Sequence, residues 1–294
     1  MEHTDIIKRI RERLNDLSEA HRLLADYLVS NYERAVFLTA YQLGQRVGVS
    51  ESTVVRFAAA LGYEGYPQFQ RALQELLRTR LTTIDRLRGA SESLEEHQTI
   101  FHKVMTVDIE DIRTTLQELN PETFAAAVDA LVQARRIYVA GFRSAFSLAY
   151  LMGYGLNWVL RNVTVVGQSP ADVPDQVLTA GPGDAVVAIS FPRYSRATVD
   201  VLALARRQRA RTLAITDSIV SPLAAHADLL LLARSNQLSY YDSFSAPLSL
   251  INALMAAVAV RDQARTMQAL DELERVWEAY GVYAFPRRKQ KGSE

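Results

Sequence analysis

Apolar residues in the first 80 positions recur every three to four residues, which is the spacing of helices that bury one face. The pattern predicts helical segments near residues 4–15, 18–31, 39–47, 51–61 and 67–80. Proline suits the first turn of a helix, which fits Pro67 at the start of the last segment. The N-terminal quarter of the chain is therefore expected to be an all-helical domain.

The pattern changes from Arg135 onward, where short apolar runs rich in β-branched residues alternate with helical stretches. Five runs are typical of strands: 135–141, 162–167, 184–191, 210–217 and 228–234. Helical periodicity also covers 99–119, 122–133, 244–261 and 264–280. Such alternation indicates right-handed βαβ units that build a parallel sheet buried on both faces. The predicted fold class is therefore α/β, with a helical N-terminal domain preceding a five-stranded parallel sheet.

Polar residues between the helical and the α/β parts favour a linker. The expected boundaries are 1–80 for the helical domain, 81–98 for the linker, 99–283 for the α/β domain and 284–294 for a flexible basic tail. The helix at 99–119 connects the linker to the sheet, so it is a candidate lever between the two domains. The apolar helix at 244–261 is a candidate dimer surface, although a helix of this composition is equally often core.

The stretch from Thr39 to Gly62 has the spacing of a helix-turn-helix. Gly48 accepts a positive φ where the first short helix must stop, and Ser50 is a good N-cap for the second. The residues expected to face the core are Leu43, Val47, Val49, Val54, Ala58 and Leu61. An ordinary helical hairpin within a larger core is the alternative interpretation.

The opposite face of the second helix carries short polar groups and one long donor, and such a surface can enter the major groove of DNA. Arg56 is the best candidate for a bidentate contact with a guanine. Its alternatives are a phosphate contact or an ion pair with Glu51. The candidate DNA contacts are Gln42, Arg46, Ser50, Ser52, Thr53 and Arg56. The motif predicts a protein that binds double-stranded operator DNA.

Composition narrows the class of protein further. The 294 residues include no cysteine, which excludes disulfides and thiolate metal sites, and the five histidines form no metal-binding motif. The 33 basic residues balance 33 acidic ones, so DNA affinity must come from a few placed arginines and from dimerisation. No run approaches the roughly 18 apolar residues of a membrane span, and the N-terminus lacks an apolar signal core. A cytoplasmic protein without membrane contact is expected.

Two blocks of the sequence resemble a known family. The run VSESTVVRFAAALGYEGYPQF resembles the DNA-binding domain of the RpiR family of bacterial transcriptional regulators. IYVAGFRSAFSLA and VVAISFPRYSRATVDVLALARRQRARTLAITDSIVSPLAAHADLLL resemble the sugar isomerase (SIS) domain that this family uses as a sensor. The resemblance implies an αβα sandwich of the SIS fold, a homodimer or homotetramer, and a palindromic operator. It also implies that a sugar phosphate changes the affinity for that operator.

The loops after the first and third strands carry the candidate ligand site. Ligands of parallel sheets bind outside the carboxyl ends of the strands, usually near a switch point in strand order. Unpaired N–H groups at the helix that follows each strand suit an anion, and arginines add a fork of donors. The candidate ligand residues are Gly141, Arg143, Ser144, Ser190, Arg193, Ser195 and Thr198. Serines that only cap helices are the alternative interpretation.

The third-strand loop departs from the usual SIS pattern, which is similar to Ser-x-Ser-Gly-x-Thr. Ser190 and Ser195 match its first and last hydroxyls, but Pro192 and Arg193 replace the central Ser-Gly. Arg143 likewise stands where a small residue is common in the first loop. We therefore expect an anion of a different shape, with sugar phosphates and sugar acids both open.

An enzyme on the same fold is the rival hypothesis. Aldose–ketose isomerisation needs a general base, normally Glu or His. No Glu or Lys occurs between Thr123 and Asp271, and the histidine in that range, His226, is expected at a helix end. No dinucleotide fingerprint or P-loop follows a strand, so no cofactor is expected. A protein that only mediates interactions is a third class. The sequence favours a regulator that binds its ligand without converting it.

Overall fold

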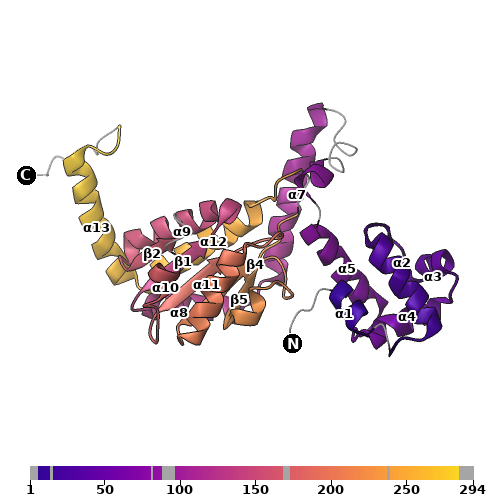
Figure 1. The fold of residues 1–294 in the computed structure, drawn as a ribbon. Coiled ribbons are helices and arrows are strands. Elements are labelled where there is room, and N and C mark those ends of the chain that lie inside the picture. The colour runs from indigo at the N-terminus through magenta and orange to yellow at the C-terminus, as the bar shows by residue number, and fades with distance from the viewer. Residues whose placement is uncertain are drawn as a thin grey trace, which may run out of the picture. The chain divides into compact units, whose positions relative to one another are not determined.

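The structure is a computed structural model that describes residues 6–13, 16–80, 82–87, 97–167, 173–236 and 239–284. Its chain divides into two compact units, Met1–Ser93 and Leu94–Glu294 (Figure 1). Each unit has a hydrophobic core of its own. Within the predicted linker, 81 and 88–96 lie outside the described residues, as does 285–294 of the predicted tail.

Helices make up the described part of the N-terminal unit up to residue 80, as the apolar period predicts. They are α1 (Ile6–Arg13), α2 (Glu19–Ala35), α3 (Ala40–Val47), α4 (Glu51–Ala60) and α5 (Tyr66–Arg80). Their apolar faces enclose Phe57, Phe69 and Leu28, which are fully buried. The rings of Phe57 and Phe69 meet edge to face, with centroids 5.9 Å apart.

Helix α2 continues to Ala35, beyond the end predicted at residue 31. The backbone leaves the helical region at Asn31, where φ is −138° and ψ is 26°. The side-chain amide of Asn31 donates to the carbonyl oxygen of Tyr27, and such bonds compete with the helix's own. The helix resumes after this break.

The α/β unit holds a parallel sheet with strand order β2-β1-β3-β4-β5. The strands are β1 (Ile137–Gly141), β2 (Val163–Val166), β3 (Ala185–Ile189), β4 (Arg211–Thr216) and β5 (Leu229–Leu232). Its helices are α7 (His97–Glu118), α8 (Pro121–Gln133), α9 (Phe146–Val159), α10 (Val173–Val177), α11 (Arg196–Arg207), α12 (Ser245–Arg261) and α13 (Gln263–Tyr280). The five predicted strands are confirmed, and each is two or three residues shorter than its apolar run.

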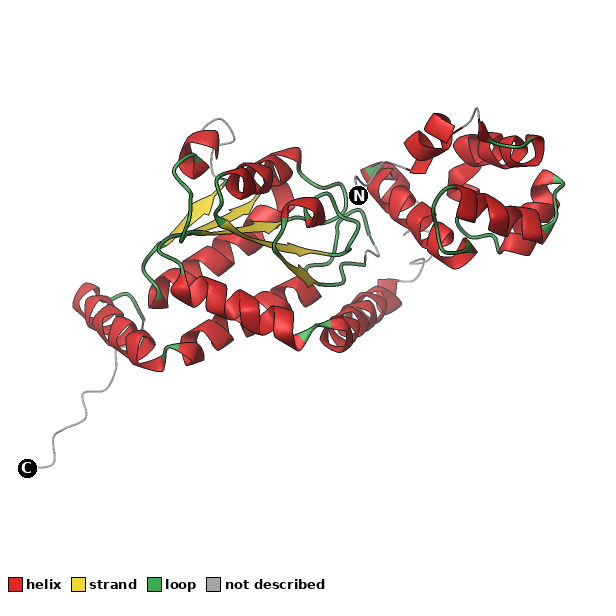
Figure 2. Ribbon diagram, turned by 90° about the horizontal axis from the view of Figure 1, so that it is seen from below, coloured by secondary structure: helices red, strands yellow, loops and turns green. Residues whose placement is uncertain are grey.

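The sheet is buried on both faces because successive side chains on a strand point to opposite sides. Ile137 and Val139 pack in one core with residues of α8, α9 and α12, whereas Tyr138 and Ala140 pack in another with residues of α10 and α11. Figure 2 shows the strands between the two helical layers. This is the αβα sandwich that the SIS resemblance implied.

The two helices singled out as lever and dimer surface differ in exposure. Leu250, Ile251 and Leu254 of α12 are buried, so the alternative interpretation of 244–261 as core describes this helix better. Helix α7 instead carries an exposed apolar stripe. Its members, each more than half exposed, are Phe101, Met105, Ile109 and Leu116.

Candidate functional site

The turn between α3 and α4 has the local structure predicted for a helix-turn-helix. Thr39 caps α3 in a capping box: its hydroxyl accepts from the N–H of Gln42, and the Gln42 side chain accepts from the N–H of Thr39. Gly48 ends α3 in the left-handed conformation, with φ 82°. The Gly44 position admits no side chain, since a Cβ there lies 2.7 Å from the Val49 carbonyl oxygen. Gly44 was missed at the sequence level because a glycine inside a helix carries no signal of what approaches it.

Helix α4 buries Val54 and Ala58 and turns its polar residues outward, as predicted, and it also buries Phe57, which was not predicted. Ser50 is its N-cap, since its hydroxyl accepts from the N–H of Thr53. The Ser50 hydroxyl lies 2.9 Å from that of Ser52 and 2.8 Å from that of Thr53, so three hydroxyls gather at the N-terminus of the helix.

Arg56 lies along the same outer face, one turn further on. Its Nε donates to the carbonyl oxygen of Ser52 and its Nη2 to the Ser52 hydroxyl, at 3.3 and 3.5 Å. Arg46 is exposed in the last turn of α3. Gln42 is exposed as well, although its amide oxygen serves the capping box. The six candidate DNA contacts therefore come from two consecutive short helices and the turn between them.

His21 of α2 packs against helix α4. Its ring meets Phe57 edge to face, with centroids 5.5 Å apart. Burial and the positive charge of Arg56 lower the pKa of His21, against a hydrogen bond with the Thr53 backbone that raises it. The neutral imidazole is thus favoured beside the cationic outer face. Sequence analysis did not assign this residue a role, because its contacts come from another helix.

The predicted ligand loops meet at the switch point of the sheet. Strand β1 pairs with β2 on one side and β3 on the other, so the strand order reverses between β1 and β3. Gly141 pairs with Ile189, which places the residues that follow both strands next to each other. A crevice at such a reversal is where α/β sheets bind ligands.

The loop after β1 turns tightly around a glycine. A Cβ on Gly141 lies 2.7 Å from the carbonyl oxygen of Ala145, so only glycine fits. The next turn, Arg143–Ala145, is a 3₁₀ helix, and α9 begins only at Phe146. Arg143 is exposed and left-handed, with φ 57°. Ser144 is half-buried in this turn, and its carbonyl oxygen accepts from the hydroxyl of Ser147.

The loop after β3 is closed by a hydrogen bond across it. The hydroxyl of Ser190, which is buried, accepts from the N–H of Ser195 at 3.1 Å. Ser195 occupies the N-cap position of α11, but its side chain makes no cap bond. Arg193 between them is left-handed, with φ 65°. The alternative interpretation of serines as simple caps therefore does not describe Ser195.

Thr198 adds an unsatisfied hydroxyl to this loop. The residue is fully buried, and its Oγ1 has no hydrogen-bond partner within the described residues. A buried polar atom in that state is uncommon and calls for a water or a ligand. Nearby, the hydroxyl of Tyr194 donates to Oδ1 of Asp217 at 2.9 Å, which ties the ends of β3 and β4 together. This pair joins residues far apart in sequence, so their spacing gave no signal of it.

One polar face of α7 holds the segment that follows β5. Asp108 accepts from the hydroxyls of Ser243 and Ser245. The buried Asp111 accepts from the N–H and the side-chain amide of Asn236. Glu118 pairs with Arg234, and Thr115 accepts from the N–H of the same residue. The spacing i, i+3, i+7, i+10 was a readable signal of one helix face, and sequence analysis did not use it.

The described parts of the chain hold neither a cluster of metal-binding side chains nor a membrane-spanning helix. No group of three or more His, Cys, Asp or Glu residues that could hold a metal ion occurs there. His226 ends a short 3₁₀ helix, Ala224–His226, as expected of a helix-end residue. None of the described helices combines the length and the hydropathy that crossing a bilayer requires.

Comparison with known proteins matches each unit to a separate family description. Residues 4–80 match the helix-turn-helix domain of the rpiR family, and residues 130–257 match the SIS domain. The HTH-type transcriptional regulator HexR of Pseudomonas aeruginosa is 30% identical over 230 residues, which covers 77% of this chain and 78% of that protein.

Solved structures agree with this assignment. The sugar isomerase domain of an RpiR transcription factor from Sphaerobacter thermophilus is 33% identical, with a TM-score of 0.58, and covers 60% of this chain and 99% of its own. NanR of Vibrio vulnificus, solved with ManNAc-6P, shares the fold at 20% identity and TM-score 0.58, covering 95% of this chain and 100% of its own. The chain therefore belongs to the RpiR family and is a helix-turn-helix transcriptional regulator with a SIS domain.

Proposed function

We propose that this regulator binds an anionic metabolite at the ends of β1 and β3, and that the bound anion changes the affinity of its helix-turn-helix for operator DNA. It binds the metabolite without converting it. The observation that carries the proposal is the pair of left-handed arginines, Arg143 and Arg193, that flank the switch point of the sheet.

The left-handed conformation is costly for any residue with a Cβ, by about 1–2 kcal/mol. Glycine removes that cost and is the usual residue at such positions. Two arginines kept there place two guanidinium forks at the strand ends, a geometry that suits phosphate or carboxylate. The first turn of α11, which follows Arg193, also contains the buried hydroxyl of Thr198, which has no hydrogen-bond partner among the described residues. The relative NanR is solved with a phosphorylated sugar, which supports the same ligand class.

The proposal excludes isomerase chemistry for lack of a base. The segment between Thr123 and Asp271 contains no Glu or Lys, and His226 belongs to a 3₁₀ helix before β5. Asp217, which follows β4, accepts a hydrogen bond from Tyr194. This bond ties the loops after β3 and β4 together, which is a structural role for the carboxylate.

The route from ligand to DNA runs through α7 in this proposal. Its face of Asp108, Asp111, Thr115 and Glu118 is bonded to the segment after β5, so a shift at the carboxyl end of the sheet reaches the helix. Only a ligand with different affinities for two arrangements of α7 changes operator binding.

The apolar stripe of α7 is the proposed contact with a second copy of the chain. Phe101, Met105, Ile109 and Leu116 are 55–74% exposed; the first three are four residues apart and Leu116 follows seven residues later, so all four lie on one side of the helix. Two copies joined about a two-fold axis present two heads to a palindromic operator. Replacing Ile109 by Glu is expected to give monomers by light scattering, whereas Val260→Glu, at an exposed residue of α12, leaves the oligomer intact. An unchanged oligomer in Ile109→Glu contradicts this contact.

The ligand half is tested by thermal shift and by DNA binding together. A panel of sugar phosphates and sugar acids is added to the full chain, and the affinity for a labelled duplex from the flanking promoter is measured by fluorescence anisotropy. At least one anion is expected to stabilise the protein and change operator affinity, and Arg143→Ala or Arg193→Ala removes both effects. Arg196→Ala, at an exposed arginine of α11, is the matched control. Stabilisation that survives both substitutions, or turnover of a sugar phosphate, refutes the proposal.

A further inference from the structure

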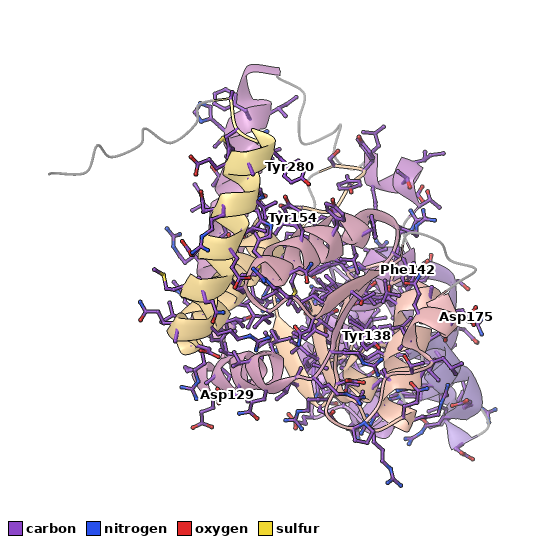
Figure 3. The ribbon with its side chains drawn as sticks, turned by 90° about the vertical axis from the view of Figure 1, so that its left-hand side faces the viewer. Asp129, Tyr138, Phe142, Tyr154, Asp175 and Tyr280 are labelled. Carbon is purple, nitrogen blue, oxygen red and sulfur yellow. The ribbon has the colours of Figure 1, made fainter. Side chains whose placement is uncertain are left out.

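A cavity lies at the amino ends of the strands, the opposite end of the sheet from the proposed ligand loops. It has a volume of about 850 Å³ and is bounded by α8 and by the segments that lead into β3, β4 and β5. Asp129 on α8 and Phe142 after β1 lie well apart in Figure 3, which shows how the two ends of the sheet are separated. A cavity of this volume falls within the range of small-molecule sites, about 300–1,000 Å³.

The acidic groups that line this cavity already have partners. The carboxylate of Asp184 accepts from Arg135 and Arg136, and that of Asp129 pairs with Arg261. The carboxylate of Asp228 accepts from the N–H and the hydroxyl of Thr212, both at 2.9 Å. Arginines therefore balance the charges of Asp184 and Asp129, whereas the carboxylate of Asp228 is held by hydrogen bonds from a neutral residue.

The basic groups that line the cavity have fewer partners than the acidic ones. Arg206, Arg209 and Arg211 all line it from the end of α11 and the start of β4. Arg206 donates to the carbonyl oxygen of Ala225. The guanidinium groups of Arg209 and Arg211 have no hydrogen-bond or ion-pair partner among the residues that the structure describes. The cavity thus presents two available guanidinium forks.

Arg209 also occupies a backbone position that glycine normally fills. The N–H of Arg209 donates to Arg206 and that of Ala210 to Ala205, which is the Schellman pattern at the end of a helix. Arg209 is the left-handed residue of that pattern, with φ 63°. Gly62 and Gly281, also left-handed, follow α4 and α13. An arginine at this position is unfavourable for the backbone.

A second helix end provides the comparison that makes Arg209 informative. Arg161 follows α9 in the same left-handed conformation, with φ 61°. Its guanidinium pairs with Glu272 at 2.5 Å and donates to the carbonyl oxygen of Ala269. Contacts within the fold therefore explain arginine at 161. They do not explain it at 209.

We propose that the cavity between α8 and the amino ends of β3, β4 and β5 is a second anion site, which binds a small organic phosphate or carboxylate through Arg209 and Arg211. This site is separate from the loops at the carboxyl ends of β1 and β3 and does not depend on them. The small apolar side chains of Ala126, Ala130 and Ala210 leave room for the body of the anion. Arginine forks bind both phosphate and carboxylate in bidentate fashion, so the probes must distinguish the two.

The sharpest variant is Arg209→Gly, because a purely structural role and a binding role predict different results. Glycine relieves the left-handed backbone, so the melting temperature of the ligand-free protein is expected to rise by about 2–4 °C. The same change removes one fork and is expected to weaken anion binding about tenfold. A stabilised protein that has lost its ligand is the signature of a binding residue.

The experiment uses the full chain, with inorganic pyrophosphate and citrate as the two probes in titration calorimetry. One of them is expected to bind the parent and Arg143→Ala equally, and to bind Arg209→Gly and Arg211→Ala more weakly. Arg207→Ala, at a neighbouring exposed arginine of α11, is the matched control. The probe that binds identifies phosphate or carboxylate as the preferred group. Binding of neither probe, or binding lost in Arg143→Ala and kept in Arg209→Gly, overturns the proposal.

Discussion

Helices α4 and α11 both begin at a serine, but only the serine of α4 forms a side-chain cap bond. Both have a serine at the N-cap and a left-handed residue two positions before it. At α4 that residue is Gly48, and the hydroxyl of Ser50 accepts from the helix itself. Before α11 it is Arg193, and the side chain of Ser195 makes no cap bond.

The difference shows which of the two helix ends has its polar groups satisfied within the fold. Helix α4 satisfies its own N-terminal end, because the Ser50 hydroxyl accepts from the Thr53 N–H. The loop before α11 retains an unfavourable backbone at Arg193, and the first turn of α11 retains the unsatisfied hydroxyl of Thr198. Residues that serve only the fold normally have favourable backbone angles and satisfied hydrogen-bonding groups. Strained or unsatisfied residues are typical of binding sites.

The prediction with the largest expected effect tests whether polar groups of the α/β unit outside the loops after β1 and β3 are fully satisfied. Asp184, elsewhere in the α/β unit, is a buried carboxylate with a full set of partners. Burial raises its pKa, but hydrogen bonds from Arg135, Arg136 and the Gly181 N–H outweigh burial and hold the pKa at about 2. Asp184→Asn is expected to lower the free energy of unfolding by about 2–4 kcal/mol at neutral pH. Urea unfolding followed by tryptophan fluorescence measures it, since Trp158 and Trp277 both lie in this unit.

The pH dependence of the same carboxylate has a definite sign. Its folded pKa lies below the unfolded value of 3.8, so the unfolded chain binds more protons between about pH 4 and 2. The contribution is therefore complete above that window and is lost as the pH falls through it. Asp184→Asn flattens this acid limb, whereas Asp200→Asn, at an exposed ion pair, leaves it unchanged. A parent protein without an acid limb contradicts the assignment.

Sequence pattern predicted the elements well and the sites unevenly. Caps and helix faces are local, so Ser50, Gly48 and the burial of Val54 were predicted correctly. The left-handed state of Arg143 and Arg193 was not predictable, because glycine is the only residue whose identity signals it. The pairing of Tyr194 with Asp217 depends on strand order, which the sequence leaves open.

The next prediction concerns the recognition of DNA by Arg56 of α4. Arg56→Ala is expected to reduce discrimination between operator and altered sequences by about 1–3 kcal/mol if the guanidinium reads a base. Arg46→Ala, on α3, is expected to weaken all duplexes alike. Anisotropy titrations at two salt concentrations separate the two outcomes. Equal weakening of every duplex by Arg56→Ala assigns it to phosphate instead.

A matched pair of serine substitutions tests the opening comparison directly. Ser50→Ala is expected to destabilise the helical unit by about 1 kcal/mol, because it removes a working N-cap. Ser195→Ala is expected to change the free energy of unfolding of the α/β unit by less than about 0.5 kcal/mol, because it removes no cap bond. Hydrogen exchange of core amides reports each unit separately. Equal losses in the two variants contradict the comparison.

The smallest expected effect concerns His21, which packs against α4 and whose pKa is lowered in part by the charge of Arg56. Burial and that charge lower the pKa of His21, so the unfolded chain, with a pKa near 6.5, binds a proton more readily. The stability of the helical unit is therefore expected to decline as the pH falls below about 6.5. NMR titration of the His21 ring measures the pKa directly. Arg56→Ala should move it back toward the ordinary value while Arg46→Ala leaves it in place, and a parent pKa at or above 6.5 shows that the imidazole does not feel the reading face.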